Sequence, residues 1–148
     1  MKTKYYNFIS KLSNLQDLPL LLIRLILAFG FYAPAMAKLQ NVHDIAIWFR
    51  SLEIPAPIFM AYLTTYTEVF GFLFLIFGFA TRFITIPLMI IMVVAIKTVH
   101  WGNGFNAGDN GFEIPLYYLV MLLLLFITGP GKISVDYLMG RKSNVNGK

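Results

Sequence analysis

The sequence predicts an all-α membrane protein, a bundle of four transmembrane helices with a short interfacial helix in the first outer loop. Hydrophobic residues make up 58% of its 148 residues, whereas charged residues make up 13%, about half the share found in soluble domains. The apolar residues gather in runs of roughly 20, the length that a helix needs to cross about 30 Å of hydrocarbon. Runs of this length are too long for barrel strands, so helices must satisfy the backbone hydrogen bonds within the lipid.

The predicted spans divide the chain into one membrane domain and two polar ends. An N-terminal segment covers residues 1–17, the membrane domain covers 18–138, and a tail covers 139–148. Within the membrane domain we expect helices over residues 18–37, 57–80, 83–100 and 114–128.

The connection between the first two spans carries a helical pattern of its own. Apolar residues fall on one face of this segment and charged residues on the other, which is typical of a helix lying in the membrane interface. The apolar residues are Val42, Ile45, Ala46, Phe49 and Leu52.

The distribution of basic residues predicts the orientation of the bundle. The side that holds both termini would carry Lys2, Lys4, Lys11, Arg82, Lys132, Arg141, Lys142 and Lys148. On the opposite side, Lys38 and Arg50 are balanced by Asp44 and Glu53. Because lysine and arginine favour the cytoplasmic side, we expect both termini in the cytoplasm.

The overall composition excludes several classes of function. The formal net charge is +5, but the sequence has no basic stripe with interleaved aromatic residues, so nucleic acid is not an expected partner. The chain has no cysteine, which excludes disulfides, thiolate metal sites and cysteine nucleophiles. The lipid bilayer is the expected surrounding of the chain. Candidate functional residues are therefore sought among the charged side chains within the predicted spans.

Two ionisable residues lie deep within the predicted spans. Arg24 is two turns into the first helix, and Glu68 is at the centre of the second. A charge at the bilayer centre costs about 2.5–3.5 kcal/mol on insertion scales and is usually paired or functional. Both residues share a helical face with small residues, which allow helices to approach closely. We therefore expect a direct or water-bridged Arg24–Glu68 pair inside the bundle.

Two interpretations of this pair are open. A structural ion pair would fix how the helices pack. Alternatively, Glu68 would be a proton or cation site. The Glu68→Gln substitution separates them, since lost activity with normal assembly favours the functional interpretation and failed assembly favours the structural one.

A second group of candidate residues is expected at the outer surface, around a loop rich in glycine and asparagine. Such a loop permits positive φ angles and tight folding over a site. The candidate outer site consists of Lys38, Lys97, His100, Trp101, Glu113 and Tyr117.

Part of this outer site has metal-binding chemistry. His100 with neighbouring carboxylates would suit a metal, and Met36 and Met60 are expected near the same boundary. In the alternative interpretation, His100 is only a hydrogen-bonding group and the methionines pack between helices.

Several stretches of the sequence resemble the DoxX family of membrane proteins. They are RLILAFGFYAPAMAKL (24–39), IPAPIFMAYLTTYTEVFGFLFLIFGFATR (54–82), the third span up to His100, and GPGKISVDYL (129–138). The residues that match the family pattern are Arg24, Lys38, Glu68, Gly129, Gly131, Ser134 and Asp136. Ala33-Pro34 departs from it, because many members have His-Gly there. The loop at 100–118 is similar to the HvfX-like branch associated with copper-binding, bufferin-type modified peptides.

The resemblance implies a four-helix bundle in the bacterial inner membrane and three candidate functions. The first is an accessory role in the maturation, export or copper handling of a bufferin-like peptide system, with the modified peptide or its proteins as partners. The second is a membrane subunit of a quinone-linked oxidoreductase similar to thiosulfate:quinone oxidoreductase, with His100 or Tyr66 binding the quinone and Glu68 relaying protons. The third is a structural anchor for a partner complex. A bundle this small would also suit assembly into a homo-oligomer, and the sequence leaves open whether the chain is an enzyme.

Overall fold

The computed structural model describes residues 15–145, with the side chains of 15–140, and every regular element in this part is a helix. Lys2, Lys4, Lys11 and Lys148 of the predicted polar ends lie outside the described residues. The elements are α2 (Asp17–Gln40), α3 (Val42–Ser51), α4 (Pro57–Phe77), α5 (Thr81–Ala95), the π-helical turn η1 (Ile96–His100), the 3-10 turns η2 (Trp101–Asn103) and η3 (Ala107–Asp109), α6 (Glu113–Thr128) and α7 (Val135–Val145). The predicted all-α class is confirmed.

Three helices are long and apolar enough to cross a membrane. They are α2, α4 and the continuous helix Thr81–Asn103, which joins α5, η1 and η2. α6 is also apolar but has 16 residues, about 24 Å at 1.5 Å per residue, which is shorter than a hydrocarbon core of about 30 Å. The fourth expected helix is therefore formed, but it is shorter than the other three.

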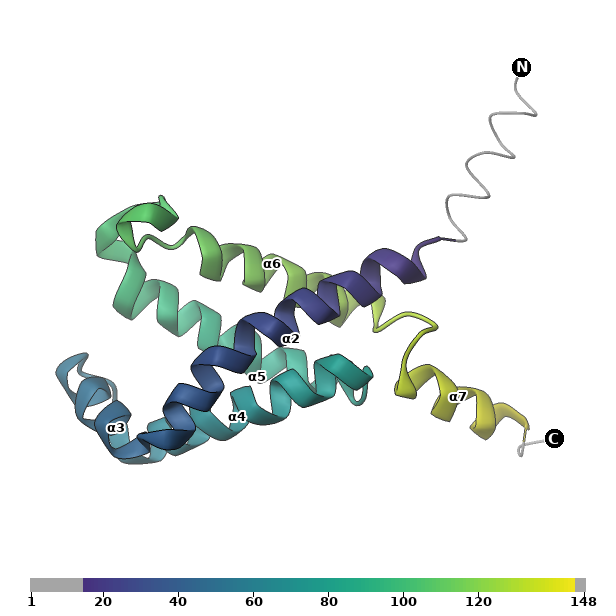
Figure 1. The fold of residues 1–148 in the computed structure, drawn as a ribbon, viewed down its shortest axis with the longest axis horizontal. Coiled ribbons are helices and arrows are strands. Elements are labelled where there is room, and N and C mark those ends of the chain that lie inside the picture. The colour runs from purple at the N-terminus through teal and green to yellow at the C-terminus, as the bar shows by residue number, and fades with distance from the viewer. Residues whose placement is uncertain (1–14, 146–148) are drawn as a thin grey trace, which may run out of the picture.

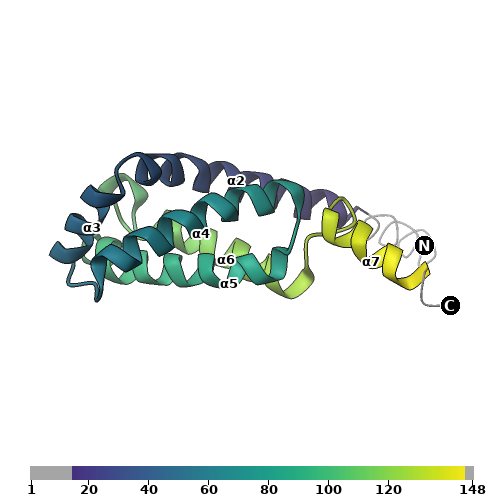
Figure 2. The same cartoon turned by 90° about the horizontal axis from the view of Figure 1, so that it is seen from below.

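The four apolar helices α2, α4, α5 and α6 pack side by side into an elongated bundle (Figures 1 and 2). α3 and the connection between α5 and α6 lie at one end, which we call the α3 end; α7 lies at the other, which we call the α7 end. The charged face of α2 points into the bundle, as the sequence predicts. Its buried residues are Arg24, Leu27, Ala28, Phe31 and Ala35.

Small residues allow these helices to approach closely. A Cβ on Gly30 of α2 would overlap the ring of Tyr118 in α6, and a Cβ on Gly71 of α4 would lie 2.9 Å from Leu88 Cδ2 in α5. Close approach in lipid relies on such residues, because lipid chains are as apolar as the helices themselves.

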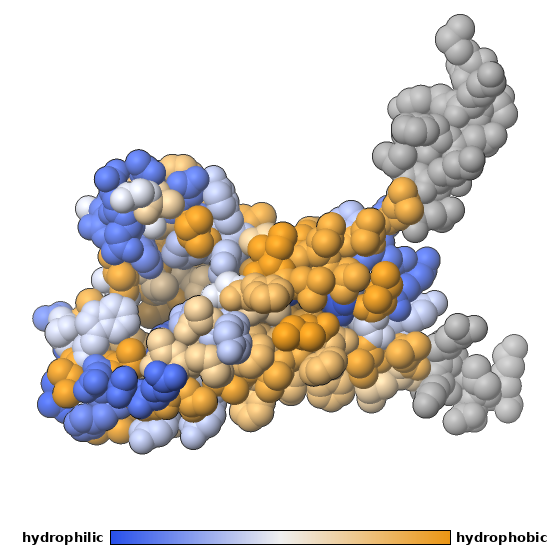
Figure 3. Space-filling view, in the orientation of Figure 1, coloured by the Kyte–Doolittle hydropathy of each residue, from blue (hydrophilic) through white to orange (hydrophobic). Residues whose placement is uncertain are grey.

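Apolar side chains also cover the outside of the bundle. Phe29 is 78% exposed and Phe83 is 77% exposed, values unusual for phenylalanine in a water-soluble domain. Figure 3 shows hydrophobic residues over the middle of the molecule and hydrophilic ones toward its two ends, with the larger groups at the α3 end. This surface is suited to contact with lipid chains.

The structure adds detail at both ends. The apolar face expected in the first connection forms α3, and its Ala46 and Phe49 pack against Ala61 of α4, so much of this face contacts protein. α7 was not expected from the sequence. Its helix runs across the predicted boundary between the membrane domain and the tail at residue 138.

Candidate functional site

Lys38 and Glu68 form a buried ion pair between α2 and α4. The Lys38 ammonium donates to Oε1 of the Glu68 carboxylate. The Glu68 side chain is 2% exposed and that of Lys38 is 17% exposed. Lys38 is in the last turn of α2, and helical side chains tilt toward the N-terminus of their helix, so Lys38 reaches back into the bundle. Glu68 Oε2 is buried and has no hydrogen-bond partner among the described residues.

The expected Arg24–Glu68 pair is not formed in the structure. Arg24 is 1% exposed, but its Nη2 donates to the carbonyl oxygen of Ile133. Arg24 and Lys38 are about 21 Å apart along α2 at 1.5 Å per residue. The prediction did not allow for the reach of Lys38 from the opposite end of the helix, nor for a backbone carbonyl as the partner of the arginine.

An apolar cavity of about 480 Å³ lies beside the ion pair, between α3, α4 and α5. Its polar groups include Lys38, Thr64 and Thr67, whereas most of its wall is apolar and includes Trp48, Phe49, Met60, Ile91, Val94 and Ala95. Small-molecule sites commonly have volumes of about 300–1,000 Å³ and a few placed polar groups. The Thr64 hydroxyl donates to the Met60 carbonyl at 2.9 Å, which leaves the hydroxyl oxygen as an acceptor and Lys38 as the cationic donor.

At the α7 end, Arg24 is enclosed by the segment that follows α6. Its Nη1 lies against Gly78, where a Cβ would overlap it. Gly78 has a φ of +64°, a left-handed conformation that glycine adopts without steric cost. Arg24 Nε and Nη1 have no hydrogen-bond partner in the part of the chain that is described.

Asp136 joins this segment to the start of α5. Its Oδ1 accepts from the Ala80 N–H at 2.7 Å and its Oδ2 accepts from the Thr81 N–H at 2.9 Å. The Asp136 N–H in turn donates to the Gly78 carbonyl at 3.0 Å. A carboxylate in this position also interacts favourably with the positive end of the helix dipole. Asp136 therefore fixes α7 to the turn between α4 and α5.

At the α3 end, Glu113 holds the loop between η2 and α6. It lies just before the apolar stretch 114–128, and its carboxylate accepts from the Ala107 N–H at 3.0 Å and from the Tyr117 hydroxyl at 2.9 Å. These hydrogen bonds, that of Ala107 first, lower the pKa of the Glu113 carboxyl because they favour its charged form. The structure thus brings Glu113 and Tyr117 of the predicted outer site together.

His100 and Trp101 contact the same loop. His100 Nδ1 lies 2.8 Å from the carbonyl oxygen of Asn110. Because a carbonyl only accepts, Nδ1 carries a proton, and in the neutral imidazole Nε2 is then an acceptor. Trp101 stacks on Phe112 with 5.3 Å between ring centroids. The predicted outer site is therefore divided, since Lys38 belongs to the ion pair with Glu68. No hydrogen bond or ion pair links Lys97 to the others in the described residues.

The candidate metal ligands come from separate helices. Met36 lies in α2, Met60 in α4 and His100 in η1. Met60 lines the cavity and packs against the Ala46, Phe49 and Ala61 cluster. Across residues 15–140, no three His, Asp or Glu side chains gather as a metal site would require.

Comparison with known proteins identifies the family. The sequence matches the DoxX family profile over residues 19–101, more than half of its length. The chain belongs to the DoxX family. Together with its long apolar helices, this membership makes it a membrane protein.

Relatives of this DoxX chain come from several bacteria. An uncharacterized protein of Haemophilus influenzae is 36% identical over 129 residues, which cover 81% of this chain and 82% of the relative. A Bacillus subtilis protein named "Putative oxidoreductase CatD" is 30% identical, covering 85% and 91% of the two chains. The "Inner membrane protein YqjF" of Escherichia coli is 26% identical, covering 88% and 99%. No solved structure matches the chain.

The residues that resemble the DoxX pattern fall into two groups in the structure. Lys38 and Glu68 form the ion pair beside the cavity. Arg24 and Asp136 hold the α7 end together, and Ser134 accepts from the Tyr137 N–H at 3.2 Å in the first turn of α7. Sequence reasoning missed the cavity, since its wall comes from several helices whose apolar residues carry no sequence signal of a pocket.

Proposed function

We propose that this DoxX protein is the quinone-binding membrane subunit of an oxidoreductase in the bacterial inner membrane. In this proposal α2, α4, α5 with its continuation, and α6 cross the bilayer, α3 lies in the outer interface, and both termini are cytoplasmic. The distribution of lysine and arginine supports the orientation, with Arg82 and Lys132 both near the α7 end. The name of the Escherichia coli relative supports the location.

The observation that carries the proposal is the apolar cavity beside the Lys38–Glu68 pair. A quinone has an apolar ring and two carbonyl oxygens that accept hydrogen bonds. The aromatic and aliphatic wall, with Trp48 and Phe49 on α3, would enclose the ring. The Lys38 ammonium would donate to one carbonyl oxygen, and a donor placed in a water-poor site stabilises the negative charge that develops there on reduction.

Glu68 would have two roles in this proposal. Its carboxylate would hold the Lys38 ammonium in position, and it would take part in proton transfer. Reduction of a quinone to the quinol requires two electrons and two protons. The sequence contains no cysteine, so the chain brings no thiol couple of its own, and in this proposal the electrons come from a partner subunit. The buried Glu68 Oε2, without a hydrogen-bond partner among the described residues, is a position where a proton could be held next to the Lys38 ammonium. The relative named as an oxidoreductase supports this class of function.

The position of the cavity changes which residue is expected to hydrogen-bond the quinone. Tyr66 is 49% exposed and His100 hydrogen-bonds to the loop, and neither lines the cavity. Lys38 takes their place as the hydrogen-bond donor to the carrier.

The test is to purify the protein from its native membrane in mild detergent and to identify bound quinone by solvent extraction and mass spectrometry. We expect near-stoichiometric quinone in the wild type and at least a tenfold loss in Lys38→Met. Lys97→Met is the matched control, because Lys97 is an exposed lysine outside the cavity, and it should retain quinone. Equal quinone content in all three proteins, or none in the wild type, would contradict the proposal.

The copper-peptide role implied by the outer loop is a separate hypothesis that the same preparation tests. His100 Nε2 is the group that would reach a metal. Copper that co-purifies with the protein and is lost in His100→Ala, without bound quinone, would replace the quinone proposal with this one. If neither copper nor quinone is present, the structural-anchor hypothesis is favoured.

A further inference from the structure

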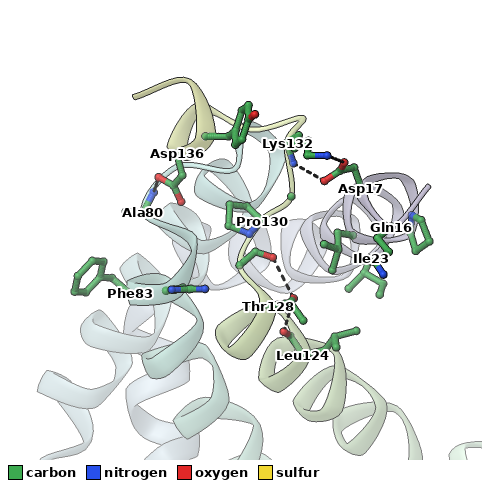
Figure 4. Close-up of a pocket in the computed structure, with 16 residues that line it drawn as sticks. Gln16, Asp17, Ile23, Ala80, Phe83, Leu124, Thr128, Pro130, Lys132 and Asp136 are labelled. Carbon is green, nitrogen blue, oxygen red and sulfur yellow. Dashed lines mark hydrogen bonds and ion pairs between the residues drawn. The ribbon is translucent and has the colours of Figure 1, made fainter. Parts of the chain in front are cut away.

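A second cavity, of about 860 Å³, opens at the α7 end of the bundle, opposite the proposed quinone site. Figure 4 shows that its labelled walls come from the starts of α2 and α5, the end of α6, and the segment carrying Pro130 and Lys132. Apolar side chains make up part of the lining. They are Leu20 and Ile23 of α2, Phe83 of α5 and Leu124 of α6.

The lining contains one cation that has no carboxylate partner in the described residues. Arg82 donates from Nη2 to the Ile127 carbonyl at 3.2 Å, and the ion pairs found in residues 15–140 involve other side chains. A guanidinium has five N–H donors in a planar fork, so most of the Arg82 donors remain for a ligand. This fork matches the oxygens of a phosphate group.

The acidic residues in the lining already have partners. Asp17 accepts from the Lys132 N–H at 2.8 Å and lies 3.4 Å from its Nζ. Asp136 accepts from two backbone N–H groups at the start of α5, where the helix dipole offsets its charge. The charge of Arg82 is therefore the one in this lining that lacks a local counter-charge.

The position of Arg82 indicates what kind of anion would bind. It is the second residue of α5, and its neighbours Phe83 and Ile127 are 77% and 65% exposed, so it lies at the edge of the lipid-facing surface. A bilayer presents phosphate groups at this depth, with acyl chains directly below them. A soluble phosphate would match Arg82 but would leave the apolar wall uncovered.

We propose that this cavity binds an anionic phospholipid, with its phosphate on Arg82 and an acyl chain along Ile23 and Leu124. An anionic headgroup is favoured over a zwitterionic one because the charge of Arg82 has no carboxylate partner among the described residues, whereas a zwitterionic headgroup brings a cation of its own. The site is at the other end of the bundle from the proposed quinone site, so each proposal can fail without the other.

Native mass spectrometry tests the proposal on the full-length protein in detergent. The probes are phosphatidylglycerol and phosphatidylethanolamine with identical acyl chains, and inorganic phosphate. We expect tighter retention of phosphatidylglycerol by the wild type and a roughly fivefold weaker affinity in Arg82→Gln, the loss of about one basic contact. Arg50→Gln, which removes the same charge in α3 at the opposite end, should match the wild type.

Three results would overturn the proposal. They are equal retention of the two lipids by the wild type, equal loss in Arg82→Gln and Arg50→Gln, and displacement of phosphatidylglycerol by millimolar inorganic phosphate, which would identify a free-anion site. Lys132→Gln provides a second variant if Arg82→Gln does not fold, with an expected loss in the same direction and of smaller size. An affinity in Lys132→Gln equal to that of the wild type would then count against the site.

Discussion

Lys38 at the end of α2 and Glu68 at the middle of α4 form an ion pair in the interior of the bundle. The partners differ in their access to the surface, because 17% of the Lys38 side chain is exposed and only 2% of Glu68. Lysine can extend its charged end toward a membrane surface while its alkyl stem stays buried. The shorter, more deeply buried Glu68 side chain cannot extend to the surface in this way. Substitutions of the two residues should therefore change the stability of the protein by different amounts.

Removal of Lys38 should destabilise the protein more than removal of the Glu68 charge. Loss of one partner from a buried pair costs about 3–5 kcal/mol, and Lys38→Met leaves the buried carboxylate unpaired. Glu68→Gln should cost less, and the double variant should be more stable than the sum of the single effects predicts. Thermal unfolding midpoints in detergent provide the measurement. Additive and equal effects would show that the pair contributes no coupling.

Gly78→Ala should disrupt the α7 end. Its Cβ would overlap Arg24 Nη1 and lie 2.6 Å from the Ser134 Cβ, and the φ of +64° is itself unfavourable for alanine. We expect a destabilisation of several kcal/mol, about the cost of overpacking added to that of backbone strain. Gly102→Ala is the matched control, since a Cβ there meets nothing within 4 Å. Similar melting temperatures for the two variants would disagree with the described packing of Arg24.

Asp136→Asn should loosen the segment between α6 and α7. An asparagine keeps one acceptor oxygen but loses the charge, and hydrogen bonds to charged groups contribute about 1.5–3 kcal/mol. Faster hydrogen–deuterium exchange at Ala80, Thr81 and residues 129–138 is the expected outcome. Asp44→Asn, in the first turn of α3, serves as the control and should leave this region unchanged. Unchanged exchange in Asp136→Asn would mean that the cap does not hold the segment.

The loop at the α3 end should lose order in acid. Hydrogen bonds from Ala107 and Tyr117 lower the pKa of Glu113, so the stabilisation is complete above the ordinary carboxyl pKa and disappears as the pH falls through the lowered value. Fluorescence of Trp101, which stacks on Phe112 in this loop, reports the change in a Trp48→Phe background. Glu113→Gln should abolish the pH step, and a step that persists in this variant would assign it to another group.

The sequence predicted the helices better than the partners of the charged residues. Runs of apolar residues located α2, α4, α5 and α6, and small residues identified the buried faces that carry Arg24 and Glu68. Periodicity gives the face of a helix but not the direction in which a long side chain extends along it. For this reason, the sequence pattern did not indicate that the partner of Glu68 is Lys38, whose side chain tilts back from the end of α2.

Other features depend on contacts between distant segments. The partner of Arg24 is the backbone carbonyl of Ile133, and backbone groups are present at every position, so no residue type indicates them. α7 has a polar sequence and begins at Val135, in the segment held by Asp136. The cavity beside Lys38 arises where α3 folds onto α4, which the helical pattern of α3 alone does not reveal.

The most direct test of the proposed quinone site uses the two tryptophans of the chain. Trp48 lines the cavity, whereas Trp101 stacks on Phe112 elsewhere, so Trp101→Phe leaves Trp48 as the sole reporter. Titration of this variant in nanodiscs with a short-chain quinone should give saturable quenching of Trp48 fluorescence. Adding Lys38→Met should weaken the affinity obtained from this titration at least tenfold. Trp48→Phe, with Trp101 alone, should show only linear quenching. Linear quenching of equal slope at both tryptophans would contradict the central claim that the cavity binds a quinone.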